Sequence, residues 1–563
     1  MGAEELGSVY ESLLELVPQV RIGESDPFRF VGDQASGEGS EGNTRKLTGS
    51  YYTPDSLVQV VLDSALEPVI AARVEGVATN SEAAAEALLS ITCMDPAMGS
   101  GHFLLGAARR LASHLARLRT DGTPSAAQYR AALRDVITHC IFGIDKNALA
   151  VELARMALWL EAATPETPLG FIDHHLRHGD ALLGLIDPGV LHHGIPDEAY
   201  DALAADERST TSMLKRRNRQ ERVSLEAQRR DGPQMGLLPT ESLGSDEYTA
   251  LEKMPDDTPE RLAAKRTQSE ALAARVADSG VMLAANLYVA AFLLPKRGNG
   301  DDVPTTRDVV AALQGQKVPD QVRSAAEAVA HRERFTHWKL AFPQVFACGG
   351  FDVVVGNPPW EKVKLSEKEY FATRAPDIAN ARNASERKRA IERLADAPDG
   401  SVEARLFEDY LQALRSAEGT GAWLHTSDRF ELTGRGDVNL YAVFAETMMR
   451  ISDDRGRSGI IVPTGIATDD STKAFFGAIS SQGRLVSLYD FENREGIFPA
   501  VDSRMKFCLL TLGSAGAAEF IFFATNARQL GDERRRFRLS PDEFALINPN
   551  SLTCPVLRSD ADA

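Results

Sequence analysis

The sequence contains few cysteines and no pair of them at metal-binding or redox spacing. Five cysteines are scattered along 563 residues, and none forms a C-x-x-C motif. This pattern argues against a disulfide framework and a structural zinc site, and it suits a reducing cytoplasm. We therefore expect a cytoplasmic protein without a structural metal.

Long apolar runs are also lacking. The most apolar helical stretch, residues 280–295, is shorter than the roughly 20 apolar residues that a membrane-spanning helix needs, and Asn286 interrupts it. The N-terminal segment MGAEELGSVYESLLELVPQV has early acidic residues and no basic region before an apolar one, which excludes a signal peptide. The sequence thus predicts no membrane association.

Positive charge is scarce, because 62 Lys and Arg face 80 Asp and Glu, which gives a net charge of −18. Any contact with a polyanion must therefore come from a local basic face. Four clusters are candidates for phosphate contacts, although each could equally be a solvated helix face. They are Lys215–Arg222, Arg229–Arg230, Arg382–Arg393 and Arg534–Arg538.

The composition is that of a globular protein, with 43% hydrophobic and 25% charged residues. Strand-like runs alternate with helical patterns, which predicts an α/β fold with a largely parallel sheet. The runs are Leu88–Met94, Cys140–Ile144, Phe351–Val355, Gly459–Val462, Leu485–Tyr489 and Phe507–Leu512. A helix is expected at Glu4–Leu16, a helical stretch at Glu367–Ala397, and a loop-like chain after Arg538.

We divide the chain into five parts from these changes in character. They are an N-terminal helical segment and linker (1–47), the first half of the α/β domain (48–184), a charged helical insertion (185–340), the second half of the α/β domain (341–530), and a C-terminal tail (531–563). The tail has no obvious closing element, so two alternatives stay open: that the chain is a whole protein, or that it is a fragment whose tail begins a missing recognition region.

The segment MDPAMGSGHF, residues 94–103, lies between an apolar run and a helix that begins near Phe103. Glycines at such a turn let the backbone approach a ligand, and a helix N-terminus offers free N–H groups. Many turns of this kind are plain connections. Asp95, which precedes the glycines, suits a cationic or ribose-bearing ligand better than a pyrophosphate, which argues against NAD and Walker-type nucleotide sites.

Two further carboxylates follow strand-like segments. Asp145 ends the run CIFGID, at the place where an α/β nucleotide site holds ribose hydroxyls. It could equally cap the helix that starts at Asn147. Asp180 is the third carboxylate, in the segment HGDALL.

The run FDVVVGNPPW, residues 351–360, ends in Asn357, two prolines and Trp360. The prolines fix the backbone and remove two donors, which leaves carbonyl acceptors beside an amide side chain. Such an edge can accept both hydrogens of an exocyclic amine, and Trp360 offers a stacking face for the ring that carries it. The alternative is a proline-stiffened loop with a core tryptophan, which leaves the preceding glycine-rich turn unexplained.

In their serial order these motifs resemble an adenine-specific, amino-group DNA methyltransferase of the γ order. The resemblance covers residues 47–184 and 341–513. Over these residues the chain is similar to the methyltransferases of type IIG restriction-modification enzymes and of the BREX and DISARM phage-defence systems. It implies a Rossmann-like class I methyltransferase sheet with a large helical insertion. It also implies S-adenosylmethionine as the cofactor and methyl transfer to N6 of an adenine flipped out of double-stranded DNA.

The resemblance further implies a role for each motif. Thr53 and its neighbours would close over the methionine moiety, Asp95 and 99–101 would line it, Asp145 would bind the ribose, and Asp180 would meet the adenine amine. The full cofactor-binding set is Tyr52, Thr53, Pro54, Asp95, Pro96, Ala97, Gly99, Gly101, Phe103, Asp145 and Asp180. The catalytic set is Asn357, Pro358, Pro359 and Trp360. In it, the Asn357 side-chain oxygen and the Pro358 carbonyl accept the N6 hydrogens, so catalysis needs positioning and electrostatics and no covalent nucleophile.

Three features are interpreted as decoys or neutral. Pro376-Asp377 with Glu386-x-Lys388 formally fits a nuclease pattern, but its second element lies in helical sequence. No nuclease-sized segment precedes Tyr51, which argues against a built-in endonuclease. His174 and His178 have i, i+4 spacing that can bind zinc on a helix, yet Gly179 follows and no cysteine is near. Met98 replaces a smaller residue in the glycine turn and is expected to be tolerated.

Two rival functions stay open. The same chemistry serves enzymes that methylate rRNA adenine or protein glutamine, although those are usually compact. The second rival is a non-catalytic subunit that binds DNA or a partner through a methyltransferase-like fold. The intact Asp95, Asn357 and Trp360 argue against this function. Little chain follows the last strand-like run, so target recognition is expected from a missing region, from the insertion, or from other restriction or defence-system subunits.

Overall fold

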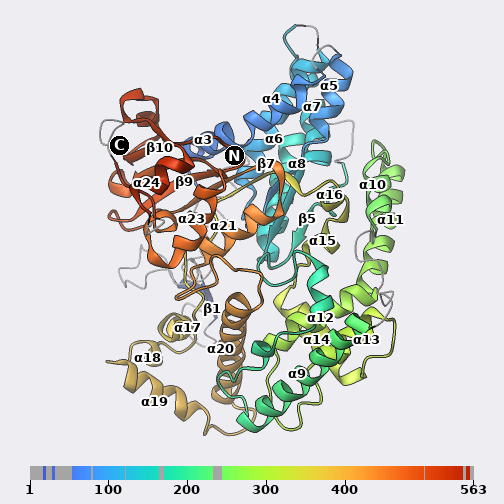
Figure 1. Ribbon diagram of the computed structural model, residues 1–563, viewed down its shortest axis with the longest axis vertical. Helices are drawn as coiled ribbons and strands as arrows, with labels where there is room; N and C mark the ends of the chain where they lie inside the picture. Colours follow the sequence, from blue (N-terminus) through green and yellow to red (C-terminus); the bar gives the residue numbers. More distant parts are fainter. Residues whose placement is uncertain are drawn as a thin grey trace.

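The computed structural model describes residues 17–20, 28–31, 53–77, 80–120, 122–163, 170–231, 244–499, 501–549 and 553–557. Its centre is a nine-stranded sheet in the order β11-β10-β8-β9-β7-β6-β3-β4-β5 (Figure 1). Of these strands, only β9 and β11 run opposite to the rest. The mixed α/β class and the largely parallel sheet predicted from the sequence are therefore confirmed.

The nine strands are β3 (Cys93–Asp95), β4 (Ile141–Asp145), β5 (Leu176–His178), β6 (Phe351–Gly356), β7 (Ser452–Pro463), β8 (Leu485–Glu492), β9 (Lys506–Leu512), β10 (Ala518–Ala524) and β11 (Phe537–Leu539). A separate antiparallel pair consists of β1 (Val17–Val20) and β2 (Phe28–Val31).

The chain order places a topological switch between β3 and β6. From β3 the chain runs through β4 to β5 at one edge, and it then returns to add β6 on the other side of β3. In parallel α/β sheets, ligands bind at such a switch, beyond the carboxyl ends of the strands. Asp95 ends β3 and Asn357 follows β6, so the two strongest sequence motifs meet at this point.

Helices bury the sheet on both faces, as parallel sheets require. In β6, Val353 and Val355 pack into one core cluster, and Val354, which points the other way, packs into the second. The first cluster is covered by α3 (Asp55–Ala65), α4 (Glu67–Glu75), α5 (Ser81–Leu89), α6 (His102–Arg119), α7 (Ala126–Cys140) and α8 (Ala148–Ala162).

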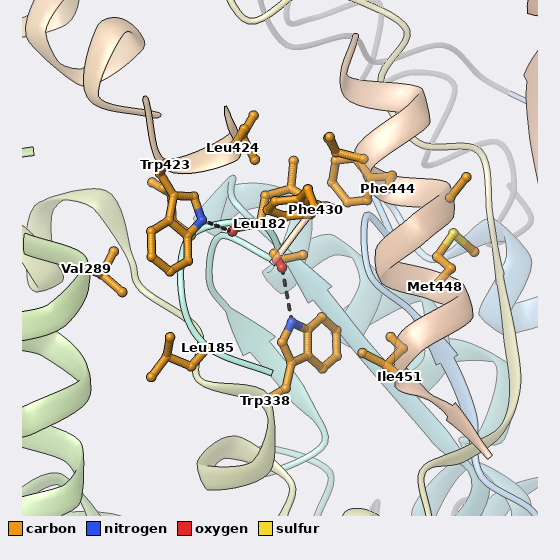
Figure 2. Packing of buried hydrophobic residues seen from close by; sticks show 14 of the residues in the cluster. Leu182, Leu185, Val289, Trp338, Trp423, Leu424, Phe430, Phe444, Met448 and Ile451 are labelled. Carbon is orange, nitrogen blue, oxygen red and sulfur yellow. Dashed lines mark hydrogen bonds between the residues drawn. The ribbon is translucent and has the colours of Figure 1, made fainter. Parts of the chain in front are cut away.

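The second cluster is covered by helices from the later part of the chain. These include α15 (Trp338–Ala341), α16 (Pro343–Ala347), α20 (Val402–Thr426), α21 (Leu440–Ile451), α22 (Gly465–Thr468), α23 (Lys473–Ser481) and α24 (Pro541–Ile547). Figure 2 shows two of its largest side chains, Trp338 and Trp423, on either side of the chain at Leu182. Both indoles are fully buried, so they fix the segment that follows β5.

The insertion is helical in its described residues. It contains α9 (Arg208–Asp231), α10 (Ser245–Glu252), α11 (Pro259–Ala277), α12 (Gly280–Leu293), α13 (Thr306–Leu313) and α14 (Asp320–Glu333). After β6 a further helical segment follows, which we call the arm. It consists of α17 (Glu367–Arg374), α18 (Pro376–Ala379) and α19 (Ala384–Leu394). Figure 1 places this arm, with α20, below the sheet.

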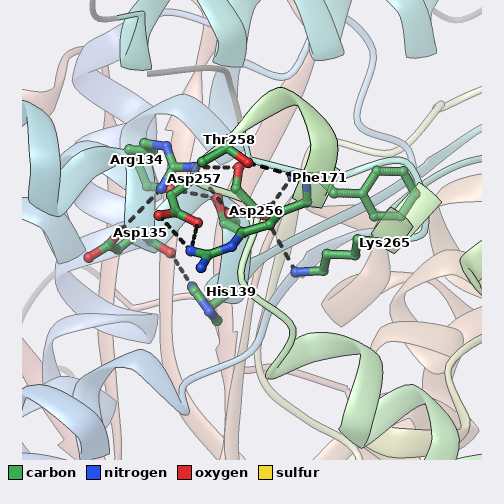
Figure 3. A network of polar contacts seen from close by, with 10 residues as sticks. Arg134, Asp135, His139, Phe171, Asp256, Asp257, Thr258 and Lys265 are labelled. Carbon is green, nitrogen blue, oxygen red and sulfur yellow. Dashed lines mark hydrogen bonds and ion pairs between the residues drawn. The ribbon is translucent and has the colours of Figure 1, made fainter. Parts of the chain in front are cut away.

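One buried carboxylate anchors the insertion to the sheet domain (Figure 3). Asp256 accepts hydrogen bonds from Arg134 of α7 at 3.0 Å, from the Phe171 backbone N–H at 2.9 Å and from Lys265 of α11 at 3.4 Å. Burial alone would raise the pKa of Asp256, but these donors outweigh it and hold the pKa below its ordinary value. Lys265 is 1% exposed, so Asp256 is also the partner that its charge requires.

Some local expectations were wrong. Leu88 and Leu89 end α5, and the strand begins only at Cys93. By contrast, His174 lies in a turn and His178 in β5, so the helical zinc spacing against which the sequence argued is not formed. The chain after Arg538 is not loop-like, because β11 pairs with β10 and α24 packs beside α23. The boundary drawn at residue 530 therefore falls inside the sheet domain.

Other local expectations are confirmed or lie outside the described residues. The nuclease-like Glu386 and Lys388 stand on α19, as expected for helical sequence. The helix at Glu4–Leu16 and the linker after it lie outside the described residues. Among the described helices no single one is long and apolar enough to cross a membrane, and the pair α11 and α12 passes the same test only as a broken span bent by 59°.

Candidate active site

The glycine turn joins β3 to α6. Gly99 and Gly101 have positive φ angles of +52° and +86°, a region in which residues with a Cβ are strained. A Cβ on Gly101 would also lie 3.1 Å from that of Ala154 in α8. A Cβ on Gly99 would meet no atom of the described residues within 4 Å, so none of them fills the space beside it. The turn therefore presents bare backbone at the N-terminus of α6.

Asp145 ties this turn to the end of β4. Its two carboxylate oxygens accept hydrogen bonds from the backbone N–H of Gly99, at 2.9 Å, and of Asn147, at 2.8 Å. The N-cap of α8 is Asn147, whose own side chain accepts from the Leu149 backbone N–H, so the alternative in which Asp145 caps this helix is wrong. The Asp145 carboxylate instead joins the residue before α8 to the glycine turn. Burial raises the pKa of Asp145 above its ordinary value, although both N–H groups oppose the shift.

Asp95 is almost completely buried at the end of β3. Its carboxylate accepts one hydrogen bond, from the Ala97 backbone N–H at 3.0 Å. Burial raises the pKa of Asp95 to about 8, and the nearby Asp145 adds to the increase. A carboxylate in this condition favours a cationic partner, because a positive charge would restore its ionised form.

Asp180 follows β5, at the edge of the sheet where β3 and β4 end in Asp95 and Asp145. One carboxylate oxygen accepts from the backbone N–H groups of Leu182 and Leu183, and the other from Lys146 Nζ at 2.9 Å. Burial alone would raise the pKa of Asp180, but Lys146 and the backbone donors outweigh it and hold the pKa below its ordinary value. Lys146 follows Asp145 directly, so it links the carboxyl ends of β4 and β5.

The segment after Asp180 is held by buried donors from distant parts of the chain. Trp338 donates its indole N–H to the Ala181 carbonyl at 3.1 Å, and Trp423 donates to the Leu182 carbonyl at 2.9 Å (Figure 2). Arg429 donates to both carbonyls, at 2.7 and 2.6 Å, and to the carbonyl of Gly184. Burial lowers the pKa of Arg429 to about 9.

Asn357 follows β6 and is contacted from both sides of its amide. Its Nδ2 donates to Thr53 Oγ1 at 3.1 Å, and its Oδ1 accepts from Trp360 Nε1 at 3.1 Å. Thr53 is buried immediately before Pro54, the N-cap of α3. The sequence motif around Thr53 and the motif around Asn357 are thus in direct contact.

Beside Trp360 a cavity of about 810 Å³ opens at the carboxyl ends of β7 and β8. It combines aromatic, hydroxyl and charged side chains, as ligand pockets do. Its lining includes Trp360, Glu361, Lys362, Asn439, Tyr441, Pro463, Thr464, Asp490 and Lys506. The Trp360 ring packs against Phe498 and Phe507, with centroids 5.5 and 6.1 Å away.

The remaining predicted residues are placed as follows. Pro96 is buried in the turn, Ala97 is half-buried, and Phe103 is 4% exposed in the first turn of α6. Met98 packs against β4, where a Cβ on Gly143 would lie 2.2 Å from its sulfur. Pro358 is buried and Pro359 is half-buried after β6. Tyr52 lies outside the described residues.

One group of described residues has donor atoms close enough for a metal ion: His174, His175 and Glu252. The two Nε2 atoms lie 3.0 and 2.8 Å from Glu252 Oε1. Burial, with His175 nearby, lowers the pKa of His174 to about 4, so a neutral ring donates to the carboxylate. Metal-ligating histidines donate their second N–H to an acceptor, but both Nδ1 atoms lack a partner among the described residues. We therefore interpret the group as an anchor for α10, and the absence of a metal site stays a prediction.

Sequence reasoning missed three residues of this region. Gly356 lies against Asp95, since a Cβ there would be 2.8 Å from Asp95 Oδ1. It stands inside the predicted motif, and its proximity to Asp95 follows from pairing of β3 with β6. Lys146 adjoins a predicted carboxylate and could have been considered. Arg429 has no local signal, because it lies 248 residues from the Ala181 carbonyl that it binds.

Two family models match this chain, and they overlap in the region of β4 and β5. The N-6 DNA methylase model matches residues 40–183, and the Eco57I restriction-modification methylase model matches residues 139–388. Over residues 40–388 the chain is therefore similar to the N6-adenine DNA methylases. This family uses S-adenosylmethionine, and the resemblance drawn from the sequence motifs is confirmed.

Curated relatives are longer than this chain. It is 24% identical over 376 residues to a protein of Methanocaldococcus jannaschii named as a type II restriction enzyme and methyltransferase, covering 59% of this chain and 29% of the relative. It is 30% identical over 174 residues to the adenine-specific methyltransferase PglX of Streptomyces coelicolor, covering 27% of this chain and 13% of PglX. The chain thus spans less than a third of either relative.

Among solved structures, the type IIL restriction-modification enzyme MmeI in complex with DNA matches 86% of this chain and 40% of its own length, at 11% identity and a TM-score of 0.33.

Proposed function

We propose that this N6-adenine methylase is the catalytic part of an enzyme that methylates flipped-out adenine in double-stranded DNA, for host marking in restriction-modification or phage defence. The observation that carries the proposal is the meeting of two sites at one switch point. The turn after Asp95 and the amide of Asn357 adjoin there through Gly356, which packs on Asp95. A methyl donor and an amine acceptor can therefore be held side by side.

The residues present fit S-adenosylmethionine. The buried carboxyl of Asp95 suits a cationic ligand, the open side of Gly99 admits a ligand close to backbone, and Asp145 keeps lone pairs for ribose hydroxyls. We propose that Asp95, 99–101 and Asp145 hold the cofactor, with Thr53 beside them and Asp180 at its adenine. The bound cofactor supplies an electrophilic methyl group.

The target adenine would enter the cavity beside Trp360 and stack on the indole. The Asn357 side-chain oxygen and the Pro358 carbonyl then accept the two hydrogens of its amine. Because the nitrogen lone pair is otherwise delocalised into the ring, these bonds concentrate electron density on nitrogen. The chain's contribution is positioning and electrostatics, which needs no covalent nucleophile.

Of the four basic clusters, the one on α19 is the best candidate for phosphate contacts. In Lys215–Arg222 four of the five cations, Lys215, Arg217, Arg219 and Arg222, pair with carboxylates, and among the described residues only Arg216 has no ion pair in that cluster. In the last cluster Arg534, Arg535, Arg536 and Arg538 all pair with carboxylates. Arg229 donates to the His192 carbonyl. On α19, Lys388, Arg389 and Arg393 are exposed, and no ion pair engages them within the described residues. Their charge is available despite the net charge of −18.

We also propose a cytoplasmic location and assembly with further restriction or defence subunits. Five free cysteines suit a reducing compartment, and one curated relative is named as a restriction enzyme as well as a methyltransferase. The enzyme is therefore tested inside a host cell and with partner subunits present.

The decisive test expresses the full-length gene in a host and sequences modified bases in genomic and plasmid DNA. We expect N6-methyladenine at a defined sequence motif, lost in Asn357→Ala. A tritium-transfer assay with the purified protein, offered DNA, structured RNA and protein in separate reactions, assigns the substrate class. Transfer to RNA or protein alone, or none to DNA with partners present, would contradict the proposal.

A further inference from the structure

The hydrogen bond from Trp360 to Asn357 settles which way the Asn357 amide faces. An indole N–H can only donate, so the atom that it meets at 3.1 Å must be the amide oxygen. At the other end, the amide nitrogen donates to Thr53 Oγ1. If the amide turned over, its NH₂ group would oppose the indole N–H, donor against donor. The indole contact therefore selects this orientation, and the Thr53 hydroxyl, which can accept from the amide nitrogen, is compatible with it.

This orientation matters because an asparagine side chain has opposite chemistry at its two ends. The oxygen accepts hydrogen bonds, whereas the NH₂ group donates them. An amine substrate is a donor, and it can be bound only by the oxygen. The oxygen has two lone pairs, so it can accept from Trp360 and from a substrate amine at the same time.

We propose that Trp360 is a positioning residue, whose indole N–H fixes the Asn357 oxygen as the acceptor for the target amine. The inference rests on the proposed function, in which that oxygen receives an adenine N6 hydrogen. It gives Trp360 a second task beside stacking. It also explains why both ends of the amide are hydrogen-bonded, the nitrogen to Thr53 before α3 and the oxygen to Trp360.

The indole cannot leave this place freely. Its ring lies edge-on to Phe498 at 76° and tilted to Phe507 at 30°, and both phenylalanines are at most 2% exposed. Phenylalanine at position 360 would keep an aromatic face but has no donor. Tyrosine carries a hydroxyl that both donates and accepts, so it would not dictate which amide atom faces it.

The first experiment separates stacking from donation. Trp360 is replaced site-specifically by benzothienylalanine, which keeps the bicyclic shape and substitutes sulfur for the N–H, and Trp360→Phe and Trp360→Tyr are made in parallel. We expect kcat to fall about tenfold in the benzothienyl and phenylalanine proteins, with little change in the KM for DNA. Trp360→Ala should raise KM as well. A benzothienyl protein with wild-type kcat would overturn the proposal.

The second experiment needs no turnover. The protein is labelled with a nitrogen isotope in its four tryptophans, and their indole N–H signals are recorded by NMR. Trp360→Phe identifies the signal of Trp360. In Asn357→Ala we expect that signal to shift and to exchange faster with solvent. Trp338 and Trp423, which donate to the carbonyls of Ala181 and Leu182, are the internal controls and should not change.

The two experiments fail in distinguishable ways. An unchanged Trp360 signal in Asn357→Ala would show that the contact does not exist and would overturn the positioning role. A wild-type protein that transfers no methyl group to DNA, but whose Trp360 signal responds to Asn357→Ala, would leave the contact in place. In that case the proposed function would be at fault, and with it the role of the amide oxygen in binding a DNA amine.

Discussion

The carboxylate of Asp95 packs directly against the backbone of Gly356, the residue before Asn357. A Cβ at position 356 would lie 2.8 Å from Asp95 Oδ1, which is closer than two such atoms can approach without a shift. Glycine therefore permits the end of β3 and the end of β6 to meet. This contact joins the proposed cofactor site to the proposed catalytic amide.

Gly356→Ala should weaken the cofactor site without unfolding the sheet. The added methyl group must displace Asp95 or push β6 away, so we expect S-adenosylmethionine to bind about tenfold more weakly. Equilibrium binding of labelled cofactor measures the change. Gly516→Ala is the matched control, because a Cβ there meets nothing within 4 Å. Wild-type affinity in Gly356→Ala would show that Asp95 does not face the cofactor.

Cofactor affinity should depend on pH through Asp95. With its pKa raised to about 8, chiefly by burial, this carboxyl is mostly protonated at neutral pH. A cationic ligand favours the ionised form, so the contribution of Asp95 to affinity should rise as the pH rises towards 8 and level off above it. Calorimetric titration in buffers on both sides of that pH measures the effect.

The control for this profile is Asp95→Asn. The α-amino group of the ligand loses its proton in the same pH range, with a pKa of about 8, which by itself lowers affinity as the pH rises. Asp95→Asn removes only the protein's contribution, so its affinity should be weak and should not rise with pH. A rising profile that persists in Asp95→Asn would assign the titration to another group.

The sheet and the candidate site could be predicted because their signals are local. Each strand near the switch is a short apolar run, and chemistry-bearing residues such as Asp95, Asp145 and Asn357 stand directly at the strand ends. Parallel pairing then brings strand ends to one edge, whatever lies between them in the sequence. For this reason a long insertion did not obscure the site.

What could not be predicted depends on contacts between distant segments. β11 has only three residues and is stabilised as a strand by pairing with β10, so its pattern alone was too short. The segment Leu88–Met94 is mostly apolar, and only the structure shows that α5 uses its first two residues. The direction of the Trp360 indole is set by packing against Phe498 and Phe507, which no motif encodes.

Arg429→Lys should loosen the segment after Asp180. The guanidinium donates to three backbone carbonyls, of Ala181, Leu182 and Gly184, whereas a lysine ammonium lacks the rigid fork to reach all of them. Leaving buried carbonyls with fewer donors costs about 1–3 kcal/mol. We expect a lower melting temperature and weaker cofactor binding, both measured by thermal unfolding with and without cofactor.

The control for this variant is Arg435→Lys, at an exposed position. It should leave both the melting temperature and the shift produced by the cofactor unchanged. If Arg429→Lys lowered the melting temperature but kept the full cofactor-induced shift, the clamp would serve stability only, and Asp180 would not depend on it.

The last prediction concerns DNA contacts by α19. Each cation that neutralises a DNA phosphate contributes about −0.9 to the slope of log affinity against log salt concentration. Lys388→Ala and Arg389→Ala should therefore each flatten that slope by about 0.9 if both cations bind phosphate. Fluorescence anisotropy with a labelled duplex over a salt series gives the slopes.

Arg217→Ala is the comparison that makes this test specific to α19. Arg217 belongs to the basic cluster Lys215–Arg222, and its side chain is exposed. It already pairs with Glu221, one helical turn away, at 3.0 Å. A cation that is neutralised by its own protein releases no counterion from DNA, so its removal should not alter the slope. If Arg217→Ala flattened the slope and the α19 variants did not, the DNA would lie against the insertion, and α19 would be only a solvated arm. Because the chain as a whole is strongly acidic, either result would locate the face on which it tolerates a polyanion.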